Sequence, residues 1–549
     1  MAVRLAIAQI NTTVGDIQGN TALIRSYVSQ AAGQGAGLVI FPEMSVCGYP
    51  PEDLLLRPRF LQDCRLAVEK LASAGAGLTV VVGFPEAHQQ TVYNSLAVLR
   101  DGQIAGIYRK AILPNYGVFD EQRYFTSGAE PLVIEAGGVN VALTVCEDIW
   151  TLPRLDNLLS KAPPFGLIVN SSASPFHCGK ILQRREAVSR CAAHFSRPLL
   201  YCNMVGGQDE LVFDGRSMAV DRSGSVLAQA AAFEQDLLII DAEAAGENQF
   251  EISCPQEQKL CKGRCEFDSI AEVYNALVLG TRDYVRKNGF TKVLIGVSGG
   301  IDSALTAVIA ADALGAENVI GVTMPSRFNS PATCADAGKL AESLGIQFRT
   351  LHIGEILEQF SKSLSQIQGW DEKGLAYENL QARIRGSALM SLSNQFSCLV
   401  LTTGNKSETA VGYSTLYGDT AGGFAVIKDV PKTMVYQLSR YVNDIAGRER
   451  IPQSIIDRIP SAELRENQKD SDSLPEYDLL DRILAGYIEQ DKSPTELIAS
   501  GLPAKTVEKV VRLVDRSEYK RRQCPPGVKI TPRAFGRDRR MPITNRYIP

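Results

Sequence analysis

Residues 293–303 read VLIGVSGGIDS, a short apolar run followed by two glycines, an aspartate and a serine. The next stretch, 304–315, has the composition of a helix, so the sequence predicts a tight strand-to-helix turn. Such turns usually bind phosphate, because the first backbone N–H groups of a helix have no partner within it. The common motif GxxxxGK[ST] adds a lysine, but here Ser298, Asp302 and Ser303 stand instead.

An aspartate beside a phosphate is explained best by a divalent cation between them. We therefore expect Asp302 to be a Mg²⁺ ligand and the turn to hold pyrophosphate. The alternative is a glycine turn whose Asp302 and Ser303 only cap the following helix. The position of the whole SGGIDS stretch between a predicted strand and a predicted helix favours phosphate binding.

The composition is that of an ordinary globular protein. At 549 residues the chain is too long for one core, and two to four units are expected. With 21% charged residues and a net charge of −4, nothing indicates binding to nucleic acid or to a membrane surface. The sequence has neither an apolar run of about 20 residues nor a secretion signal, so a cytoplasmic location is predicted.

Cysteine and histidine usage argues against a metal centre built from these residues. In the cytoplasm the 12 cysteines are expected to be thiols. Cys254, Cys261 and Cys265 cluster, but their spacing fits no common zinc pattern and no histidine lies nearby. The chain has only four histidines, which also disfavours a Ser-His-Asp triad.

Two α/β series are predicted, separated by a linker. Strands of the first series are expected at 4–10, 37–43, 78–84, 95–100, 139–148, 165–172, 199–206 and 236–242, with a hairpin over 217–230 that turns at Ser223-Gly224. Periodicity stops from about 243 to 267. A helix at about 268–288 then opens a second series, with strands at 293–297, 318–325, 348–353 and 398–405 and helices between them. This alternation predicts a doubly wound parallel sheet. The predicted domains are 1–245 and 268–549, joined by 246–267.

The second series resembles a known family of adenylating enzymes. SGGIDS resembles the signature of the ATP pyrophosphatases, which cleave ATP between its α and β phosphates. ENLQARIRGSALM (378–390), LTTGNKSETAVGYSTLYGDTAGG (401–423), PSAELR (460–465) and KRRQCPPGVK (520–529) resemble the synthetase domain of NAD synthetases. The resemblance implies ATP and Mg²⁺ as reactants and a carboxylate made reactive by adenylation, with AMP as leaving group.

The resemblance also implies roles for single residues. The ATP-binding positions would be Gly296, Val297, Ser298, Gly299, Gly300, Ile301, Asp302, Ser303 and Thr403. Asn379, Glu408 and Lys520 would contact deamido-NAD (nicotinic acid adenine dinucleotide), and Glu408 would join Asp302 as a metal ligand. Further candidates in this domain are Arg383, Lys406, Asp419 and Lys432.

Three residues of the first series predict covalent chemistry. Glu43 ends one predicted strand, Lys110 lies in GIYRKAILPNY, and Cys146 ends the strand VNVALTV. A thiol at a strand end needs a base to take its proton and a cation to stabilise the negative charge. Glu43 can be that base and Lys110 that cation. Each could alone be a buried cysteine, a surface lysine or a strand-end carboxylate, but together they favour catalysis.

This arrangement resembles the nitrilase (carbon–nitrogen hydrolase) superfamily, which implies an αββα sandwich and a Glu-Lys-Cys triad. In the members that use glutamine, the positions matching Tyr116, Ser174 and Lys180 hold that substrate. Ser172 is an alternative to Ser174. Glu121 is a further candidate carboxylate near the triad.

Taken together, the chain resembles the glutamine-dependent NAD synthetases. The resemblance implies that ammonia from L-glutamine converts deamido-NAD to NAD⁺ in the last step of NAD biosynthesis, with AMP, pyrophosphate and glutamate as the other products. It also implies a protected ammonia tunnel and a homo-oligomer. Two rival hypotheses are an amidotransferase with another acceptor and an RNA-binding protein that uses the arginine-rich stretch 520–540. The acidic net charge and the prolines and glycines of that stretch disfavour RNA.

Overall fold

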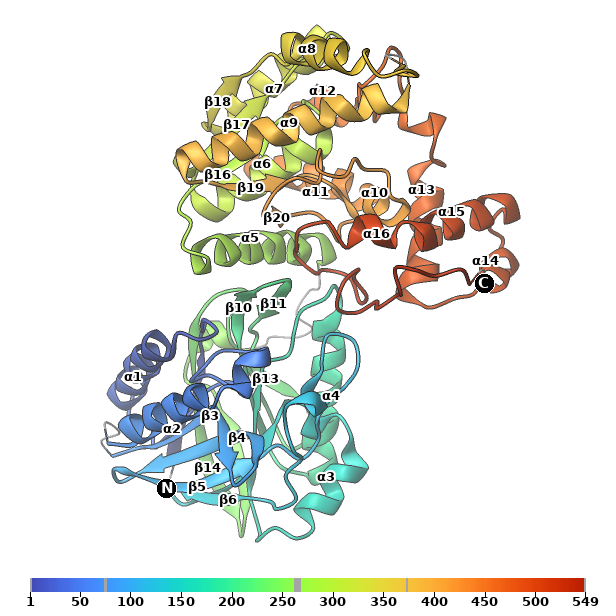
Figure 1. The fold of residues 1–549 in the computed structure, drawn as a ribbon. Helices are drawn as coiled ribbons and strands as arrows, with labels where there is room; N and C mark the ends of the chain where they lie inside the picture. Colours follow the sequence, from blue (N-terminus) through green and yellow to red (C-terminus); the bar gives the residue numbers. More distant parts are fainter. Residues whose placement is uncertain (1, 74–76, 261–267, 372–373, 548–549) are drawn as a thin grey trace. The chain divides into compact units, whose positions relative to one another are not determined.

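The structure, a computed structural model, describes residues 2–73, 77–260, 268–371 and 374–547. The chain divides into two compact units, Met1–Phe267 and Asp268–Pro549 (Figure 1). Among the described residues, no helix has the length and apolar character that crossing a membrane would need.

The N-terminal unit contains two large sheets. The first has the order β15-β14-β1-β2-β3-β4-β5 and the second the order β13-β12-β9-β8-β7-β6. The strands of the first are β1 (Ala2–Gln9), β2 (Leu38–Ile40), β3 (Thr79–His88), β4 (Thr91–Arg100), β5 (Gln103–Arg109), β14 (Asp236–Gly246) and β15 (Gln249–Ser253). Those of the second are β6 (Val133–Ala136), β7 (Val139–Val145), β8 (Leu167–Ser172), β9 (Leu199–Asn203), β12 (Met218–Val220) and β13 (Val226–Gln229). A separate hairpin joins β10 (Val205–Gln208) to β11 (Leu211–Asp214).

Helices cover the outer face of each sheet. α1 (Ile17–Gly33) and α2 (Pro58–Ala72) pack on the first sheet, and α3 (Leu152–Leu159) and α4 (Lys180–Phe195) lie on the side of the second (Figure 1). Strand β1 shows why the run Leu5–Ala8 is apolar without interruption. Leu5 and Ile7 join the core between the sheets, whereas Ala6 and Ala8 pack towards α1 and α2. Successive side chains point to opposite faces, and both faces are covered. The predicted αββα sandwich is confirmed.

The C-terminal unit is built on a five-stranded parallel sheet with the order β18-β17-β16-β19-β20. The strands are β16 (Val293–Gly296), β17 (Val319–Thr323), β18 (Gln347–Thr350), β19 (Leu399–Thr402) and β20 (Phe424–Ala425). The chain moves outward from β16 to β18 and then returns to the other side of β16 at β19. This reversal confirms the predicted doubly wound sheet and places the loops after β16 and β19 side by side.

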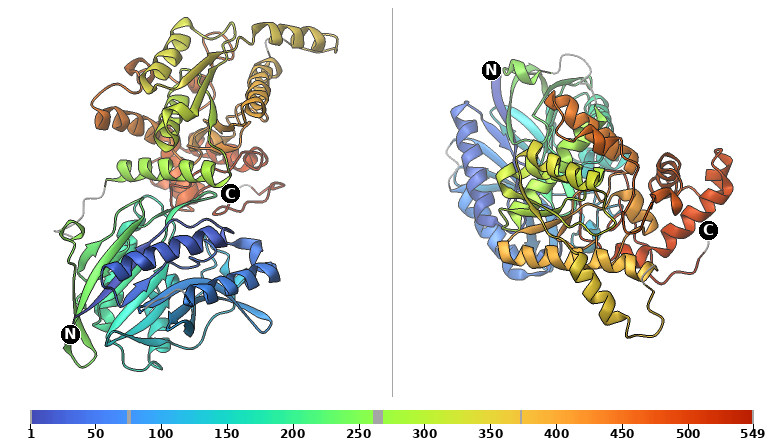
Figure 2. Two further views of the ribbon diagram at one scale, coloured as in Figure 1. Left: turned by 90° about the vertical axis from the view of Figure 1, so that its left-hand side faces the viewer. Right: turned by 90° about the horizontal axis from the view of Figure 1, so that it is seen from above.

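Helices lie on both faces of this sheet. α5 (Ser269–Lys287), α6 (Ile301–Leu314), α7 (Pro331–Leu344), α11 (Lys432–Ala446) and α12 (Gln453–Ile456) pack with one another on one face. α9 (Leu375–Phe396) packs on β16 and β19 from the other face and contacts α8 (Gly354–Leu364) (Figure 2). The predicted helix at 268–288 is α5, and the Asp268 carboxylate accepts hydrogen bonds from the N–H groups of Ile270 and Ala271, which fixes its start.

A separate apolar cluster holds the C-terminal helices together. It joins α10 (Lys406–Val411) to α13 (Tyr477–Leu484), α14 (Pro494–Ala499) and α15 (Ala504–Arg516), and α16 (Glu518–Arg521) follows. The arginine-rich stretch 520–540 begins in the last turn of α16 and contains several side chains that are buried in this unit, among them Arg521 and Arg539.

Two sequence predictions can be compared directly with the strands. The hairpin predicted at Ser223-Gly224 is confirmed, because β12 pairs antiparallel with β13. The expectation that periodicity stops at about 243 is wrong, because β14 continues to Gly246 and β15 then pairs with it. Phe250 and Ile252 are buried in β15 and their neighbours are exposed, so its alternation was present in the sequence. Cys261 and Cys265 lie outside the described residues.

Candidate active sites

The first site centres on a buried ion pair between Lys110 and Glu43. Glu43 follows β2 and Lys110 follows β5, and the lysine Nζ lies 2.7 Å from Glu43 Oε1. Both side chains are fully buried. The Asn94 amide donates to Glu43 Oε1 at 2.7 Å, and the Ala173 N–H donates to Oε2 at 2.9 Å. The carboxylate is thus held in one orientation from three directions.

Glu121 is a second carboxylate on the same lysine. Its Oε1 lies 2.8 Å from Lys110 Nζ and accepts a hydrogen bond from the Tyr49 hydroxyl at 2.9 Å. Burial raises the pKa of Glu121 to about 7, with Lys110 opposing and Glu43 adding to the shift. Burial works against the charge of Lys110, but Glu121, Glu43 and Cys146 outweigh it and raise the lysine pKa well above its ordinary value.

Cys146 stands where β7 ends and a short 3-10 helix, η3 (Cys146–Ile149), begins. Its φ of 43° is in the left-handed region, which non-glycine residues adopt rarely and often at functional sites. The thiol is 3% exposed. Burial and the Glu43 carboxylate raise the pKa of Cys146, and Lys110 opposes them. The resting thiol is therefore protonated, and besides the two predicted partners the carboxylates of Glu147 and Glu121 also act to raise its pKa.

Asp148 holds the cysteine turn against the lysine loop, a role that the sequence analysis missed. Its carboxylate accepts hydrogen bonds from the Val145 N–H at 2.8 Å, the Ile112 N–H at 2.9 Å and the Tyr108 hydroxyl at 2.8 Å. Two segments of backbone that flank Cys146 and Lys110 are therefore fixed by one buried side chain. The only signal in the sequence was the position of this aspartate two residues after the cysteine.

Two of the predicted glutamine-binding residues converge on Glu147, the neighbour of Cys146. The hydroxyl of Tyr116 donates to Glu147 at 3.0 Å while the tyrosine side chain stays largely exposed. Lys180, the first residue of α4, lies with its Nζ 4.2 Å from the centre of the Trp150 ring. Burial raises the pKa of Glu147, whereas Tyr116 and Lys180 act to lower it.

Ser172 and Ser174 are both buried, with different partners. The Ser172 hydroxyl donates to Asn170 Oδ1 at 2.7 Å. The Ser174 N–H donates to Asn203, and the Ser174 hydroxyl oxygen accepts from Arg184 at 3.4 Å. The Ser172 hydroxyl proton is thus already donated within the fold.

The second site begins at the turn between β16 and α6. The Ser298 N–H donates to the Ser303 hydroxyl at 3.2 Å, and the Gly300 N–H donates to the Ser298 hydroxyl at 3.2 Å. Gly299 has a φ of +81°, and a Cβ there would lie 2.3 Å from the Thr333 carbonyl oxygen. The turn therefore needs glycine at this position, and it directs the first N–H groups of α6 outward.

Asp302, in the first turn of α6, lies in a cluster with residues from the starts of α10 and α11. Its Oδ1 accepts from the Asn405 amide at 2.8 Å, and its Oδ2 lies 2.5 Å from Lys432 Nζ. Glu408 Oε1 lies 3.2 Å from the same Lys432 nitrogen. Burial raises the pKa of Glu408 to about 7, with Lys432 opposing and Asp302 adding to the shift. Asp302 and Glu408, the two predicted metal ligands, thus both contact the Lys432 ammonium.

The other predicted dinucleotide residues meet at the turn of residues 412–415. Asn379, on α9, accepts from the Thr415 hydroxyl at 2.8 Å. Lys520, on α16, donates to the carbonyls of Gly412 at 2.7 Å and Ser414 at 2.8 Å. Asp419 accepts from the Thr415 N–H at 2.6 Å. Residues far apart in the sequence therefore hold a single turn.

The remaining predicted positions of this unit lie in different surroundings. Thr403 follows β19 directly, two residues before Asn405. Arg383 donates from Nε to the Leu416 carbonyl at 3.2 Å, next to the turn of residues 412–415. Lys406 is fully buried and points into a separate polar cluster.

Comparison with known families agrees with this division into two sites. Residues 4–248 match the carbon–nitrogen hydrolase family, and residues 273–524 match the NAD synthase family. The chain is thus a carbon–nitrogen hydrolase fused to an NAD synthase.

Full-length relatives share both parts. The chain is 46% identical to the glutamine-dependent NAD(+) synthetase of Thermotoga maritima over 570 residues, covering 99% of each chain. It is 45% identical to that of Acinetobacter baylyi, covering 100% of this chain and 99% of the relative. The solved glutamine-dependent NAD+ synthetase of Acinetobacter baumannii, a complex with ADP, superposes with a TM-score of 0.79 at 42% identity and 99% coverage of both chains. The chain therefore belongs to the glutamine-dependent NAD(+) synthetase family.

Proposed function

We propose that Cys146 releases ammonia from glutamine and that the cluster around Asp302 uses ATP to prepare deamido-NAD for attack by that ammonia. The enzyme is a glutamine-dependent NAD⁺ synthetase. The observation that carries the proposed division of labour is the presence of two complete charge clusters, Glu43–Lys110–Glu121 and Asp302–Lys432–Glu408, in separate compact units.

In the first reaction, Glu43 takes the proton from the Cys146 thiol, and the sulfur attacks the amide carbon of glutamine. Lys110 stabilises the negative oxygen of the tetrahedral intermediate. Glu43 returns the proton to the departing nitrogen, ammonia leaves, and a glutamyl thioester remains on Cys146. Water activated by Glu43 then hydrolyses the thioester to glutamate. Tyr116, Ser174 and Lys180 hold the substrate, and the position of Tyr116 and Lys180 near Glu147, the neighbour of Cys146, supports the assignment of these two residues.

In the second reaction, the carboxylate of deamido-NAD attacks the α-phosphorus of ATP, and pyrophosphate leaves. Ammonia then attacks the adenylated carboxyl carbon and AMP departs, which gives NAD⁺. The Ser298–Ser303 turn would bind the pyrophosphate through its N–H groups and hydroxyls, and Thr403 would contact ATP. Asn379 and Lys520, which meet at the turn of residues 412–415, would bind deamido-NAD together with Glu408.

The Asp302 cluster also fits a magnesium ion. Carboxylate oxygens are the ligands that Mg²⁺ prefers, and it commonly takes one or two of them together with substrate phosphates. Asp302 and Glu408 already share one ammonium, Lys432, so their oxygens converge where a cation is needed. When bound, Mg²⁺ would neutralise charge on the departing pyrophosphate.

The products distinguish this reaction from other uses of ATP. With glutamine, deamido-NAD and ATP, we expect one AMP and one pyrophosphate for each NAD⁺ formed, measured by ³¹P NMR and chromatography. Release of ADP and orthophosphate would contradict the proposal, because it would mean that the γ-phosphoryl group is transferred. Other carboxylates in place of deamido-NAD serve as the control for acceptor choice.

Two further proposals concern the whole protein. Free ammonia is mostly ammonium at neutral pH and is then no nucleophile, so we propose protected transfer between the two sites. We also propose a homo-oligomer. Sedimentation velocity of the full chain tests the second proposal, and a species at the mass of a single chain at micromolar concentration would contradict it.

A further inference from the structure

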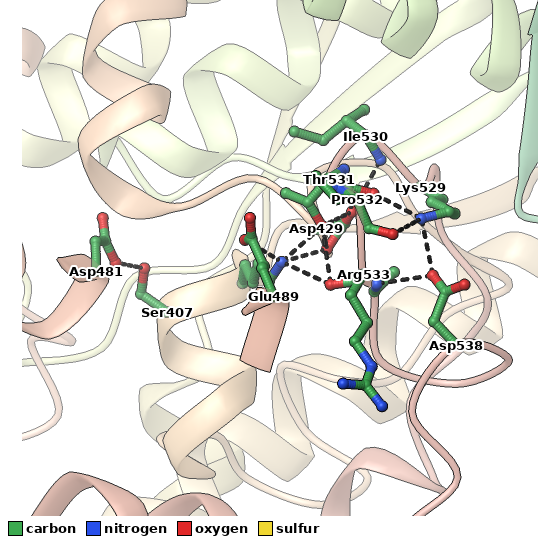
Figure 3. Close-up of polar contacts among 12 residues, drawn as sticks. Ser407, Asp429, Asp481, Glu489, Lys529, Ile530, Thr531, Pro532, Arg533 and Asp538 are labelled. Atoms are coloured by element: carbon green, nitrogen blue, oxygen red, sulfur yellow. Dashed lines mark hydrogen bonds and ion pairs between the residues drawn. The ribbon is translucent and has the colours of Figure 1, made fainter. Parts of the chain in front are cut away.

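Lys406 lies in a buried polar cluster that the reaction scheme above does not use. Figure 3 shows three of its partners, Asp429, Glu489 and Thr531. Lys406 is the first residue of α10 and is 1% exposed. Its Nζ lies 3.0 Å from Asp429 Oδ1, 2.8 Å from Glu489 Oε1 and 2.7 Å from the Thr531 hydroxyl. An ammonium has three protons, and hydrogen bonds to Glu489, Thr531 and the Arg533 carbonyl account for all three. Lys406 is therefore committed to the fold, and the prediction that it contacts substrate is disfavoured.

The cluster attaches the C-terminal segment 529–538 to the body of the unit. Asp429 accepts from the N–H groups of Ile530 at 2.8 Å and Thr531 at 2.7 Å, and also from the Thr531 hydroxyl. Lys406 donates to the Arg533 carbonyl at 3.1 Å. This segment lies beyond residue 524, where the NAD synthase family match ends. The contacts to Lys406 thus come from a part of the chain that this family model does not cover.

Asn405 and Glu408, which lie close to Lys406 in the sequence, contact the Asp302 cluster instead of segment 529–538. Asn405 donates to Asp302, and Glu408 contacts Lys432, which also contacts Asp302. The Lys406 N–H donates to the Val430 carbonyl at 2.9 Å, so the backbone between Asn405 and Glu408 is held at this point as well. One short segment therefore carries the Asp302 partners on one side and the anchor to segment 529–538 on the other.

We propose that Lys406 is a positioning residue of the synthetase reaction, and that segment 529–538 fixes the start of α10, residues 405–408, through it. This inference rests on the proposed ATP site at Asp302. Without the Lys406 ammonium, the buried carboxylate of Asp429 and the partly buried carboxylate of Glu489 would both lose a cation, a change that proteins tolerate poorly. The start of α10 would move to relieve the repulsion between the Asp429 and Glu489 carboxylates. This movement would carry Asn405 and Glu408 away from Asp302 and Lys432.

Lys529 provides a matched control. It is a buried lysine of the same segment, and its Nζ donates to the Thr531 carbonyl at 2.6 Å and the Pro532 carbonyl at 3.0 Å and lies 2.8 Å from Asp538. These partners all belong to segment 529–538 itself, and none is among residues 405–408 at the start of α10. Lys529→Met therefore removes a buried ammonium of the segment and leaves the Lys406 contacts in place.

The experiment compares Lys406→Met and Lys529→Met in the full-length enzyme with ammonium as nitrogen donor. We expect Lys406→Met to raise the KM for ATP about tenfold and Lys529→Met to change it less than about threefold. Loss of folded protein would lower kcat and leave KM unchanged, so the KM separates positioning from stability. Glutamine hydrolysis by the N-terminal unit should be unchanged in both variants.

Thr531→Val tests the same link with a smaller change, should Lys406→Met fail to fold. It removes the hydroxyl that joins Lys406 to Asp429, and we expect the KM for ATP to rise about threefold. An unchanged KM in both the Lys406 and Thr531 variants, or an equal rise in Lys529→Met, would overturn the proposal. Absence of ammonium-driven NAD⁺ synthesis in the wild-type enzyme would instead refute the proposed function.

Discussion

At the scale of single residues, the first site works through charges that are buried together. Lys110 lies between two carboxylates, Glu43 and Glu121, at almost equal distances. Protonation of Glu121 therefore decides whether the three groups carry a net charge of zero or of −1. A cluster with a net negative charge attracts the proton of the Cys146 thiol more strongly than a neutral one, and the pKa of Glu121 at about 7 places this change in charge near neutrality.

This charge balance predicts the pH dependence of glutamine hydrolysis. As the pH rises through about 7, Glu121 loses its proton, and kcat for glutamine hydrolysis should rise with it. The glutamine side chain of the Glu121→Gln variant carries no charge at any pH in this range. The pH profile of kcat for this variant should therefore lack the rise. The measurement is kcat between pH 5.5 and pH 8.5 at saturating glutamine. An unchanged inflection in Glu121→Gln would assign the titration to another group.

Sequence reasoning could identify the triad because Glu43 and Cys146 stand at the ends of apolar strand patterns and Lys110 lies in the stretch GIYRKAILPNY between them. It could not identify Asn94, Tyr49 or Asp148, whose role is to orient the triad. These residues are ordinary polar positions until folding brings them to Glu43, Glu121 and the Cys146 turn. The same holds for Asp429 and Thr531, which are about a hundred residues apart in the sequence and meet at Lys406.

At the scale of elements, the decisive feature is the turn from β16 into α6. Its apolar run and paired glycines were visible in the sequence, and the structure gives the reason for Gly299: a positive φ together with close contact to Thr333. Strands with continuous apolar runs were predicted well, because both of their faces are covered. β5 was missed because it mixes exposed and half-buried positions, and β15 because it is short and lies beside polar residues.

Gly299→Ala tests the turn, with Gly289→Ala as its control. Both glycines have a φ of +81°, but only Gly299 would place its Cβ against backbone, whereas nothing lies within 4 Å at Gly289. The left-handed backbone costs an alanine about 1–2 kcal/mol at either position. Only Gly299→Ala should additionally abolish ATP binding, as measured by isothermal titration calorimetry. Equal ATP affinity in the two variants would contradict the proposed role of the turn.

At the scale of the whole molecule, the account joins two reactions in one chain. The full-length match to glutamine-dependent NAD(+) synthetases covers both units, and each unit contains its own buried charge cluster. The sequence predicted the two fold classes, since each follows from the order of strands and helices. The contacts of segment 529–538 were not predictable from the sequence. A segment in which proline, glycine and arginine are interspersed resembles a solvated tail.

The most direct test of the division of labour compares Cys146→Ala with the wild-type enzyme, with either glutamine or ammonium as nitrogen donor. The quantity measured is NAD⁺ formed per enzyme per second at saturating ATP and deamido-NAD. We predict that Cys146→Ala makes no NAD⁺ from glutamine but keeps the wild-type rate with ammonium. Loss of both activities, or persistence of the glutamine-driven one, would contradict the account.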